Sequence, residues 1–402
     1  MSRRSVSLVS LASVVGLCAI AACSSPQNLS GFNKGEKDPA AADSPGTFGD
    51  PKGTNPDGTP KEACVPSKGN AEIPGNNCDD DGDGKVDNVT VCDTGLAADG
   101  SAEDFAKTMG ICQTAAKDGY GIVSAKFTRG FGRDDEPKAQ QHGVLAKFGN
   151  VLKPREGSQL GVLSSGYAQE FDGSPGTKFG GDAPGKDWFN ARPGGAGNGT
   201  APPGFPKPAE GCPVDSSVND VIDLRLELKA PPNASGIKFD FNFHSGEWPA
   251  FICSRFNDGF VAYLSAQGFN GGKPDNISFD SKKNPVSVNN GFFDRCTANA
   301  SVGCAPGAKP ATSTCPAGPD ELAGTGFGIL GNYCRGGGGQ TVAGGATGWL
   351  SSQAAVKAGE TFTLDLMIWD TGDGDLDSSV LLDNFQWIAG TTPVVTSTDR
   401  PR

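Results

Sequence analysis

Three stretches of the chain alternate between large apolar residues and mostly polar ones. Ile222–Leu228, Ile237–Phe243 and Phe362–Ile368 carry Ile, Leu or Phe at every second position. A period of two residues places one face of a β-strand on a core and the other face toward water. The pattern therefore predicts three half-buried strands.

Shorter apolar stretches, separated by turns rich in Gly and Pro, predict further strands. They are Ile122–Thr128, Gly143–Phe148, Gln159–Ser164, Phe260–Leu264, Val286–Asn289 and Val380–Ile388. Because strands do not alternate with helices, this series favours a mainly β fold, a jelly-roll-like β-sandwich. Phe171–Pro213 and Asn299–Gly348 are rich in Gly, Pro and Ala, and we expect them to form long surface loops.

One short helix is predicted near residue 105. Ser101-Ala-Glu-Asp104 has the form of a capping box, in which the first and last side chains bond each other's backbone N–H. Phe105, Met109, Cys112 and Ala116 then recur at helical spacing. The helix is expected over 103–117.

The first residues have the organisation of an export signal. Two arginines precede an apolar stretch, Val6–Ile20, that is too short to span a bilayer. The segment ends in Ile20-Ala-Ala-Cys23, which resembles the lipobox of bacterial lipoproteins, where the cysteine is lipidated and becomes the mature N-terminus. The resemblance implies a signal peptide over 1–22, a lipid anchor on Cys23 and, because Ser24 is not Asp, the outer membrane or cell surface. The alternative is an ordinary signal peptide cleaved near Ala22.

Composition divides the rest of the chain. Residues 23–62 hold few large apolar side chains, so we expect a disordered tether with a reach of about 35 Å. A Cys-rich and Asp-rich segment follows over 63–95, then the sandwich over 96–390 and a tail over 391–402. The formal charge of −12 argues against nucleic acid, because phosphates are bound by Lys and Arg. Gly326–Gly331 fits a dinucleotide fingerprint without its strand and helix, so no nucleotide is expected either.

Ten cysteines remain after Cys18 and Cys23. They fall into four before residue 113 (Cys64, Cys78, Cys92 and Cys112) and six after residue 211 (Cys212, Cys253, Cys296, Cys304, Cys315 and Cys334). An even number in an exported chain predicts disulfides, with pairing inside each group and the connectivity open. Zinc sites and free thiols are the alternatives, although the CxxC pairs of many zinc sites are absent.

The segment 76–87 carries the sharpest local chemistry. Asp79, Asp81 and Asp83 alternate, Gly84 permits a tight turn, and Lys85 and Asp87 follow. This spacing lets carboxylates and the Lys85 carbonyl converge on calcium, as in the first part of an EF-hand loop. Thr90 stands where an EF-hand has its bidentate Glu, so weak affinity is expected, on the order of 10⁻⁴–10⁻³ M. The alternative is a solvated acidic turn.

Several phrases, taken in order, resemble the choice-of-anchor L domain of bacterial surface proteins. They are Gly161–Gly166, Phe239–Pro249, Arg255–Phe260, Ala262–Ser265, Asn276–Ser278, Pro285–Asn290 and Ala358–Phe362 running into Asp370–Ser378. The resemblance covers roughly residues 120 to 390. It implies that the chain is a module held at the cell surface. It gives a weaker indication of any biochemical activity.

The resembling phrases contain many oxygen ligands. A second cation site would form if the strand ends carrying them met at one rim of the sandwich. Its candidates are Glu247, Asn257, Asp258, Asp370, Asp373, Asp375 and Asp377. The alternative is that these side chains only cap turns.

No catalytic motif is present. HExxH and GxSxG are absent, and His142 and His244 are expected to be structural. We therefore expect a non-catalytic, calcium-binding surface protein with an adhesive or interaction role. One alternative is a glycan-binding module, favoured if Trp248, Trp349, Trp369 or Trp387 lines an exposed groove. The other is a hydrolase with an Asp/Glu pair about 5–9 Å apart.

Overall fold

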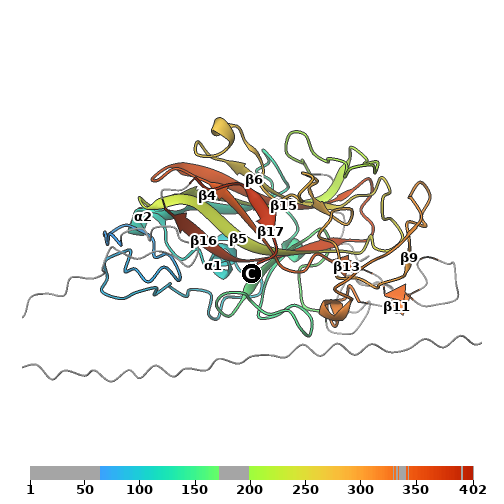
Figure 1. Cartoon of the computed structure of the whole chain (residues 1–402), viewed down its shortest axis with the longest axis horizontal. Coiled ribbons are helices and arrows are strands. Elements are labelled where there is room, and N and C mark those ends of the chain that lie inside the picture. Colours follow the sequence, from blue (N-terminus) through green and yellow to red (C-terminus); the bar gives the residue numbers. More distant parts are fainter. Residues whose placement is uncertain are drawn as a thin grey trace, which may run out of the picture. The chain divides into compact units, whose positions relative to one another are not determined.

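Two antiparallel sheets lie face to face, with the long alternating strands at their centres (Figure 1). The computed structural model describes residues 64–171, 199–328, 330–331, 334, 341–342, 344–390 and 393–401. The expected signal peptide, Cys23 and the tether lie outside these residues. None of the helices in the described ranges is long and apolar enough to cross a membrane.

Each sheet orders its strands differently from the sequence. The first sheet has the order β1 (Gly121–Thr128), β4 (Val218–Lys229), β15 (Thr361–Thr371), β6 (Gly259–Ser265) and β7 (Asp275–Asn276), and β8 (Val286–Ser287) also pairs with β6. The second has the order β17 (Ser397–Asp399), β14 (Leu350–Ala355), β5 (Ala234–Ser245), β16 (Ser378–Ala389), β3 (Leu160–Ser164) and β2 (His142–Leu145), and β13 (Gly345–Ala346) pairs with β5. Two small pairs join β9 (Ser301–Val302) to β10 (Ala311–Thr312) and β11 (Leu330–Gly331) to β12 (Thr341–Val342).

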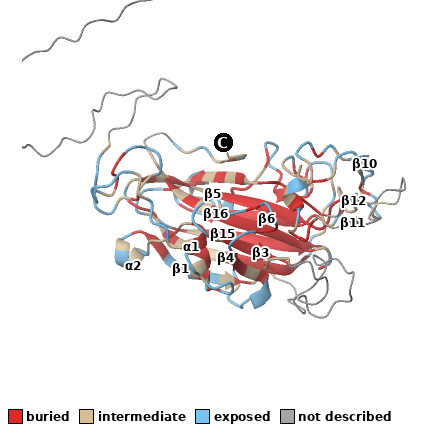
Figure 2. Ribbon diagram, turned by 90° about the horizontal axis from the view of Figure 1, so that it is seen from below, coloured by how far each residue is buried: buried red, intermediate tan, exposed pale blue. Residues whose placement is uncertain are grey.

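The core between the sheets consists of the apolar halves of the alternating strands, drawn as buried in Figure 2. Leu226 of β4, Phe241 of β5 and Leu366 of β15 are each 0% exposed. The Phe241 ring lies 4.9 Å from that of Phe260 on β6, which joins the sheets. Burying one such side chain contributes about 1.5–3 kcal/mol. The β-sandwich and the nine predicted strands are confirmed, although β2 ends before Phe148 and β8 ends before Asn289.

The predicted helix over 103–117 is wrong as a single element. The described residues form two short helices, α1 (Ala102–Thr108) and α2 (Ala115–Asp118), and three 3₁₀ turns, Ala139–Gln141, Asn270–Gly272 and Asp320–Leu322. The capping box at Ser101 is present. The helix stops because Gly110 adopts φ 88° and because Cys112 is bonded to Cys92.

Five disulfides staple the described chain. They are Cys64–Cys78, Cys92–Cys112, Cys212–Cys253, Cys296–Cys315 and Cys304–Cys334. Pairing inside each of the two groups is confirmed. The expected tail also contains structure, since β17 pairs with β14 and the Thr398 and Ser352 hydroxyls bond at 2.7 Å.

Candidate metal centres and a neighbouring pocket

The segment 76–87, which we call the acidic loop, is folded by its own carboxylates. Asp79 accepts hydrogen bonds from the backbone N–H groups of Asp83 and Gly84, both at 3.0 Å. Asp81 also accepts from Asp83 N at 3.0 Å, and Asp83 accepts from Lys85 N at 2.8 Å. Gly84 adopts φ 92°, which residues with a side chain rarely tolerate. The alternating aspartates thus bend the chain into a compact turn.

Three carboxylates converge beside this turn. One oxygen each of Glu72, Asp79 and Asp81 lies within 4.8 Å of the others. This spacing fits a hard cation with oxygen ligands at about 2.3–2.6 Å. The Asp83 and Asp87 carboxylates lie outside this group of three.

Asp87 does not take the place predicted for it as a ligand. Its φ of 54° turns the chain. Its carboxylate accepts from the backbone N–H groups of Asn76 at 3.1 Å and Asn77 at 3.3 Å. Asp83 accepts from the side chain of Asn88 at 2.9 Å as well as from Lys85 N.

Glu72 was not found from the sequence. It precedes Asp79 by seven residues, whereas an EF-hand acid follows the loop, so spacing gave no signal. Its Oε1 accepts from Asp87 N at 2.9 Å, and no donor reaches its buried Oε2. Burial raises the pKa of Glu72, and nearby Asp80 and Asp81 raise it further against two backbone hydrogen bonds. Ala71 anchors the segment that carries Glu72 to the sandwich through two hydrogen bonds with the side-chain amide of Asn233.

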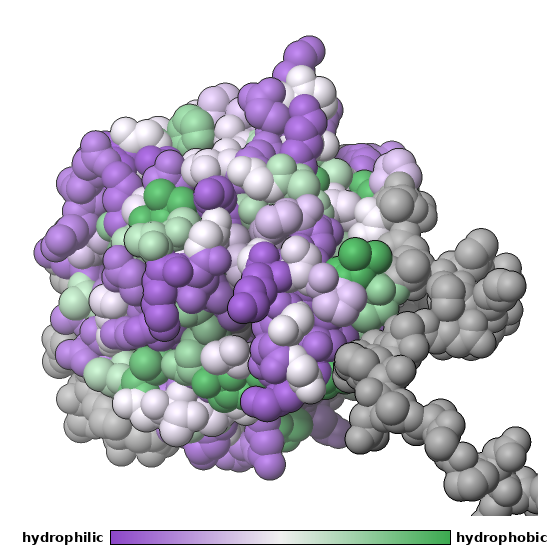
Figure 3. Space-filling view, turned by 90° about the vertical axis from the view of Figure 1, so that its left-hand side faces the viewer, coloured by the Kyte–Doolittle hydropathy of each residue, from purple (hydrophilic) through white to green (hydrophobic). Residues whose placement is uncertain are grey.

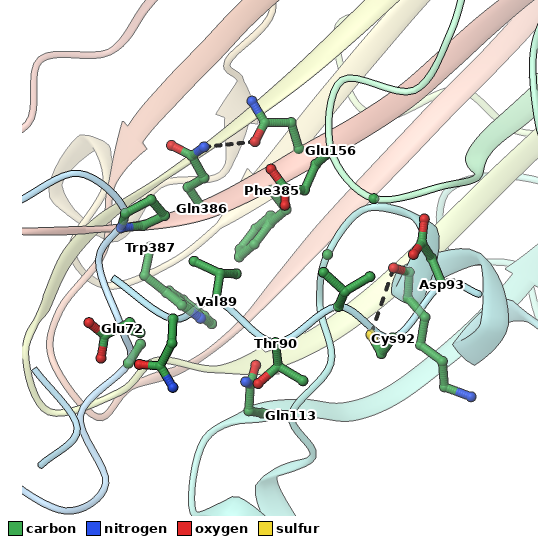
Figure 4. A pocket seen from close by; sticks show the side chains of 18 of the residues that line it. Glu72, Val89, Thr90, Cys92, Asp93, Gln113, Glu156, Phe385, Gln386 and Trp387 are labelled. Atoms are coloured by element: carbon green, nitrogen blue, oxygen red, sulfur yellow. Dashed lines mark hydrogen bonds between the residues drawn. The ribbon is translucent and has the colours of Figure 1, made fainter. Parts of the chain in front are cut away.

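A pocket of about 110 Å³ lies where the acidic loop meets the sandwich (Figure 4). Phe385 and Trp387 of β16 line it with rings that meet edge to face at 5.1 Å. Glu72, Gln113 and Gln386 add polar groups to its lining. Figure 3 looks at this end of the molecule, which is mostly hydrophilic with small apolar patches. Its mixture of aromatic and polar lining resembles that of ligand pockets, but it is smaller than the roughly 300–1,000 Å³ that such pockets usually have, so it would receive only a small group.

At one rim of the sandwich, four strand ends bring a second set of carboxylates together. Glu247 follows β5, Asp258 precedes β6, Asp370 is the last residue but one of β15, and Asp377 precedes β16. We call these four residues the rim cluster. The ends meet because Ser378 pairs with Ser245 in one sheet and Trp369 pairs with Gly259 in the other.

Asp258 ties the two sheets at this rim. It accepts from Thr371 N of β15 and from the Ser378 hydroxyl of β16, both at 2.9 Å. Gly246 N donates to the Asp377 carbonyl at 3.0 Å, which brings the end of β5 to the same place.

The rim cluster is almost sealed from solvent. Asp258 is 0% exposed, Asp370 is 1%, and Glu247 and Asp377 are each 2%. No hydrogen-bond donor reaches either oxygen of Asp370 or the Oε2 of Glu247. The described residues show no ion pair to any of these three acids, Glu247, Asp258 and Asp370.

The pKa values follow from this burial. Desolvation and then the charges of Asp258 and Asp373 raise the pKa of Glu247 well above its ordinary value. Desolvation, Asp258 and Asp377 do the same to the pKa of Asp370. Burial raises the pKa of Asp258 to about 7 against the hydrogen bonds it accepts.

The remaining predicted residues of this site surround the rim cluster, and the charge of Asp373 acts on both Glu247 and Asp258. Asn257 accepts from the Asn289 amide at 2.7 Å and so holds two loops together. Asp373 is partly buried and Asp375 is exposed, with Asp375 N donating to Asp373 at 3.1 Å. Asp220 was missed by the sequence analysis. A bulge between β4 and β15 and a φ of 48° place it near Asp370.

The expected aromatic and histidine positions are largely internal. Trp248 and Trp369 are 2% exposed and Trp387 is 7%, so these three form no exposed groove, whereas Trp349 is partly buried. His244 is buried between Phe148 and Phe327, and burial lowers its pKa to about 3. His142 stacks on Phe127 at 3.9 Å, and burial lowers its pKa too.

Residues 215–386 match the family model of the Choice-of-anchor L domain. The matched region holds the central strands of both sheets and the whole rim cluster, and the acidic loop precedes it. Searches of curated proteins and of solved structures returned no match. The family match indicates a bacterial surface-associated protein.

Proposed function

With the Choice-of-anchor L match over residues 215–386 as its premise, we propose that this chain is a lipid-anchored bacterial surface protein that binds calcium and an external partner without catalysis. Acyl chains on Cys23 supply the membrane anchor, in the outer membrane or at the cell surface. Residues 23–62 then hold the sandwich away from the lipid. The five disulfides are in keeping with an oxidising, extracytoplasmic compartment.

The calcium proposal is carried by one observation, the convergence of Glu72, Asp79 and Asp81 oxygens within 4.8 Å. Asp79 already has backbone donors, so the loop folds without an ion and gains little on binding one. This supports weak binding, which suits an environment where calcium is millimolar.

The pocket beside the acidic loop is the proposed contact for the partner, a protein or a glycan. Glu72 lines this pocket and also belongs to the group of three carboxylates, so calcium would fix one wall of it. A glycan is the second candidate, since Phe385 and Trp387 line this pocket, although each is only 7% exposed and so offers little ring face for a sugar to stack on. Against a hydrolase, the carboxylates with the most strongly raised pKa values are buried rather than set in a cleft.

Fatty-acid labelling tests the anchor. Wild-type cells grown with labelled palmitate should incorporate label into this protein, and Cys23→Ala should abolish it. A Cys18→Ala variant is the matched control, because that residue lies inside the expected signal peptide. Label that persists in Cys23→Ala would end the lipoprotein proposal.

Ligand binding tests the pocket. Gln113→Ala combined with Gln386→Ala should weaken glycan or partner binding at least tenfold without lowering the melting temperature by more than a few degrees. Unchanged binding to the same glycan array would remove the pocket from the proposal.

A further inference from the structure

Within the rim cluster, burial is least compensated at Asp370, because Asp258 accepts two hydrogen bonds and Asp370 accepts none. The Asp370 carboxylate is 1% exposed, and no donor reaches either of its oxygens. The nearby Ser165 hydroxyl donates to the Ser378 carbonyl at 3.3 Å, and it also lies close enough to Asp370 to lower the pKa of that carboxyl against the effect of burial. Buried polar groups in folded proteins are nearly always partnered, and buried charges are paired or coordinate a metal. A positively charged group would therefore be needed to neutralise this buried carboxylate, and the described residues form no ion pair with it.

We propose that the rim cluster binds a divalent, oxygen-preferring cation of the calcium class. Asp370 and Glu247 are its principal ligands, because their unpartnered oxygens are buried at the same rim. Asp258 contributes a third carboxylate, since each of its oxygens accepts one hydrogen bond and keeps a second lone pair. Among the described residues, three acid oxygens lie within 4.8 Å of one another only beside the acidic loop, so the rim carboxylates must move closer together to bind one ion. This site is separate from the acidic loop and from the pocket.

The chemistry of the donors selects the cation. The proposed ligands all offer carboxylate oxygens, and the side chains of Ser165 and Ser378 beside them offer hydroxyl oxygens, which suits calcium, magnesium or manganese rather than zinc or copper. His244 is held between two phenylalanine rings, and Cys253 is bonded to Cys212, so neither is available as a softer ligand.

The surrounding backbone is shaped around the acids. A Cβ added at Gly166 would lie 2.2 Å from Asp377 Oδ2, and one added at Gly374 would lie 2.5 Å from Asp220 Oδ2. The glycines let two loops close over the carboxylates. A cation at this place would join the ends of β5, β6, β15 and β16, and so both sheets.

A proton is the competing occupant. Asp258 and Asp370 act directly on each other's pKa, and two such acids can share one proton. The two occupants differ in their response to Asp370→Asn. The substitution keeps the shape of the side chain and removes a carboxylate ligand, so a bound metal would be lost. The Asn amide can donate the hydrogen bond that a shared proton would make between the two acids, so a proton-sharing pair would be little affected.

The experiment measures metal content and melting temperature of the full-length protein. The variants are Asp370→Asn, Glu247→Gln and, as the matched control, the double variant Asp79→Asn/Asp81→Asn in the acidic loop. After gel filtration in metal-free buffer, the wild type and the loop variant should retain one ion per chain, which Asp370→Asn and Glu247→Gln lose. Chelation should lower the melting temperature of the wild type by on the order of 10 °C.

Two results would overturn the proposal. One is a wild type that retains no ion and melts at the same temperature with and without chelator. The other is an Asp370→Asn variant that binds as much metal as the wild type. If Asp370→Asn does not fold, the metal content of the wild type and of Glu247→Gln decides. Failure of the loop variant alone to bind calcium concerns only the proposed function.

Discussion

The acidic loop and the rim cluster use the same side chain in opposite surroundings. In the acidic loop, aspartates near the surface accept backbone N–H groups, as Asp79 does from Asp83 and Gly84. In the rim cluster, Asp370 is buried and no donor reaches it. The loop is therefore a stable turn whether or not an ion is bound. The buried carboxylates of the rim cluster are stable only when a bound cation or a proton neutralises them.

This contrast sets the two affinities. A ligand that binds only the folded state stabilises it by RT ln(1 + [L]/Kd). For a loop site with Kd on the order of 10⁻³ M, millimolar calcium adds well under about 1 kcal/mol. A site whose ion removes uncompensated buried charge gains more from binding, because an isolated buried carboxylate costs several kcal/mol.

The largest expected effect comes from removing Asp258. In Asp258→Ala, Thr371 N and the Ser378 hydroxyl lose their acceptor inside the rim. Breaking such a buried polar arrangement should cost about 3–5 kcal/mol of the free energy of unfolding, measured by urea denaturation in saturating calcium. Asp81→Ala, in the acidic loop, is the control and should cost less than about 1 kcal/mol. Equal losses in the two variants would remove the distinction between the regions.

The disulfide of the loop segment comes next. Cys64 and Cys78 are 14 residues apart, and a loop of about that length is worth about 3 kcal/mol when closed. Cys64→Ser/Cys78→Ser should raise hydrogen exchange over residues 64–90 and weaken calcium binding by the loop. Exchange at β5 and β15 should stay unchanged. Faster exchange spread evenly over both sheets would contradict the independence of the two regions.

The fold followed from the sequence more completely than either site. Strong alternation, as in Ile237–Phe243, fixes which face is buried, and all nine predicted strands are present. Strand β14 was not predicted, because the Ser and Ala residues of Leu350–Ala355 differ little in hydrophobicity from one position to the next. The predicted helix was too long, because the periodicity of apolar residues contains no information about the disulfide at Cys112.

The sites depended on long-range contacts that spacing cannot encode. The rim candidates were named because they follow or precede strands, and Glu247, Asp258 and Asp370 do meet there. Glu72 is brought to the acidic loop by the path of the chain and by Asn233, 162 residues from Ala71. The position of Asp220 depends on a bulge between β4 and β15, and this bulge cannot be predicted without the register of the two strands.

Asp383 offers a case between the two regions, because it is buried and also has donors. It accepts from Arg155 N at 2.7 Å and Asn384 N at 2.6 Å, and burial still raises its pKa to about 7. The folded state thus keeps a proton that the unfolded state loses near pH 3.8. This contribution to stability is complete below that pH and is lost as pH rises toward 7.

The free energy of unfolding should therefore fall by up to about 1.4 kcal/mol per pH unit between pH 5 and 7. Urea denaturation in saturating calcium, at pH 5, 6 and 7, measures this slope. Asp383→Asn should flatten it, and a variant that keeps the wild-type slope would assign the proton to another group.

The smallest effect concerns Glu72. Glu72→Gln should weaken calcium binding by the loop about five- to tenfold, or about 1 kcal/mol, because one of three converging carboxylates becomes neutral. Glu103→Gln, at an exposed position of α1, is the matched control and should leave binding unchanged. Calcium titration followed by the melting temperature measures both, and equal curves for the two variants would exclude Glu72 as a ligand.

Calorimetric titration of the metal-free protein with calcium tests the central claim most directly. We expect two classes of site, one with Kd on the order of 10⁻⁶ M or tighter that is absent from Asp370→Asn, and one near 10⁻⁴–10⁻³ M that is absent from Asp79→Asn/Asp81→Asn. A single weak class in the wild type, unaffected by Asp370→Asn, would contradict the account.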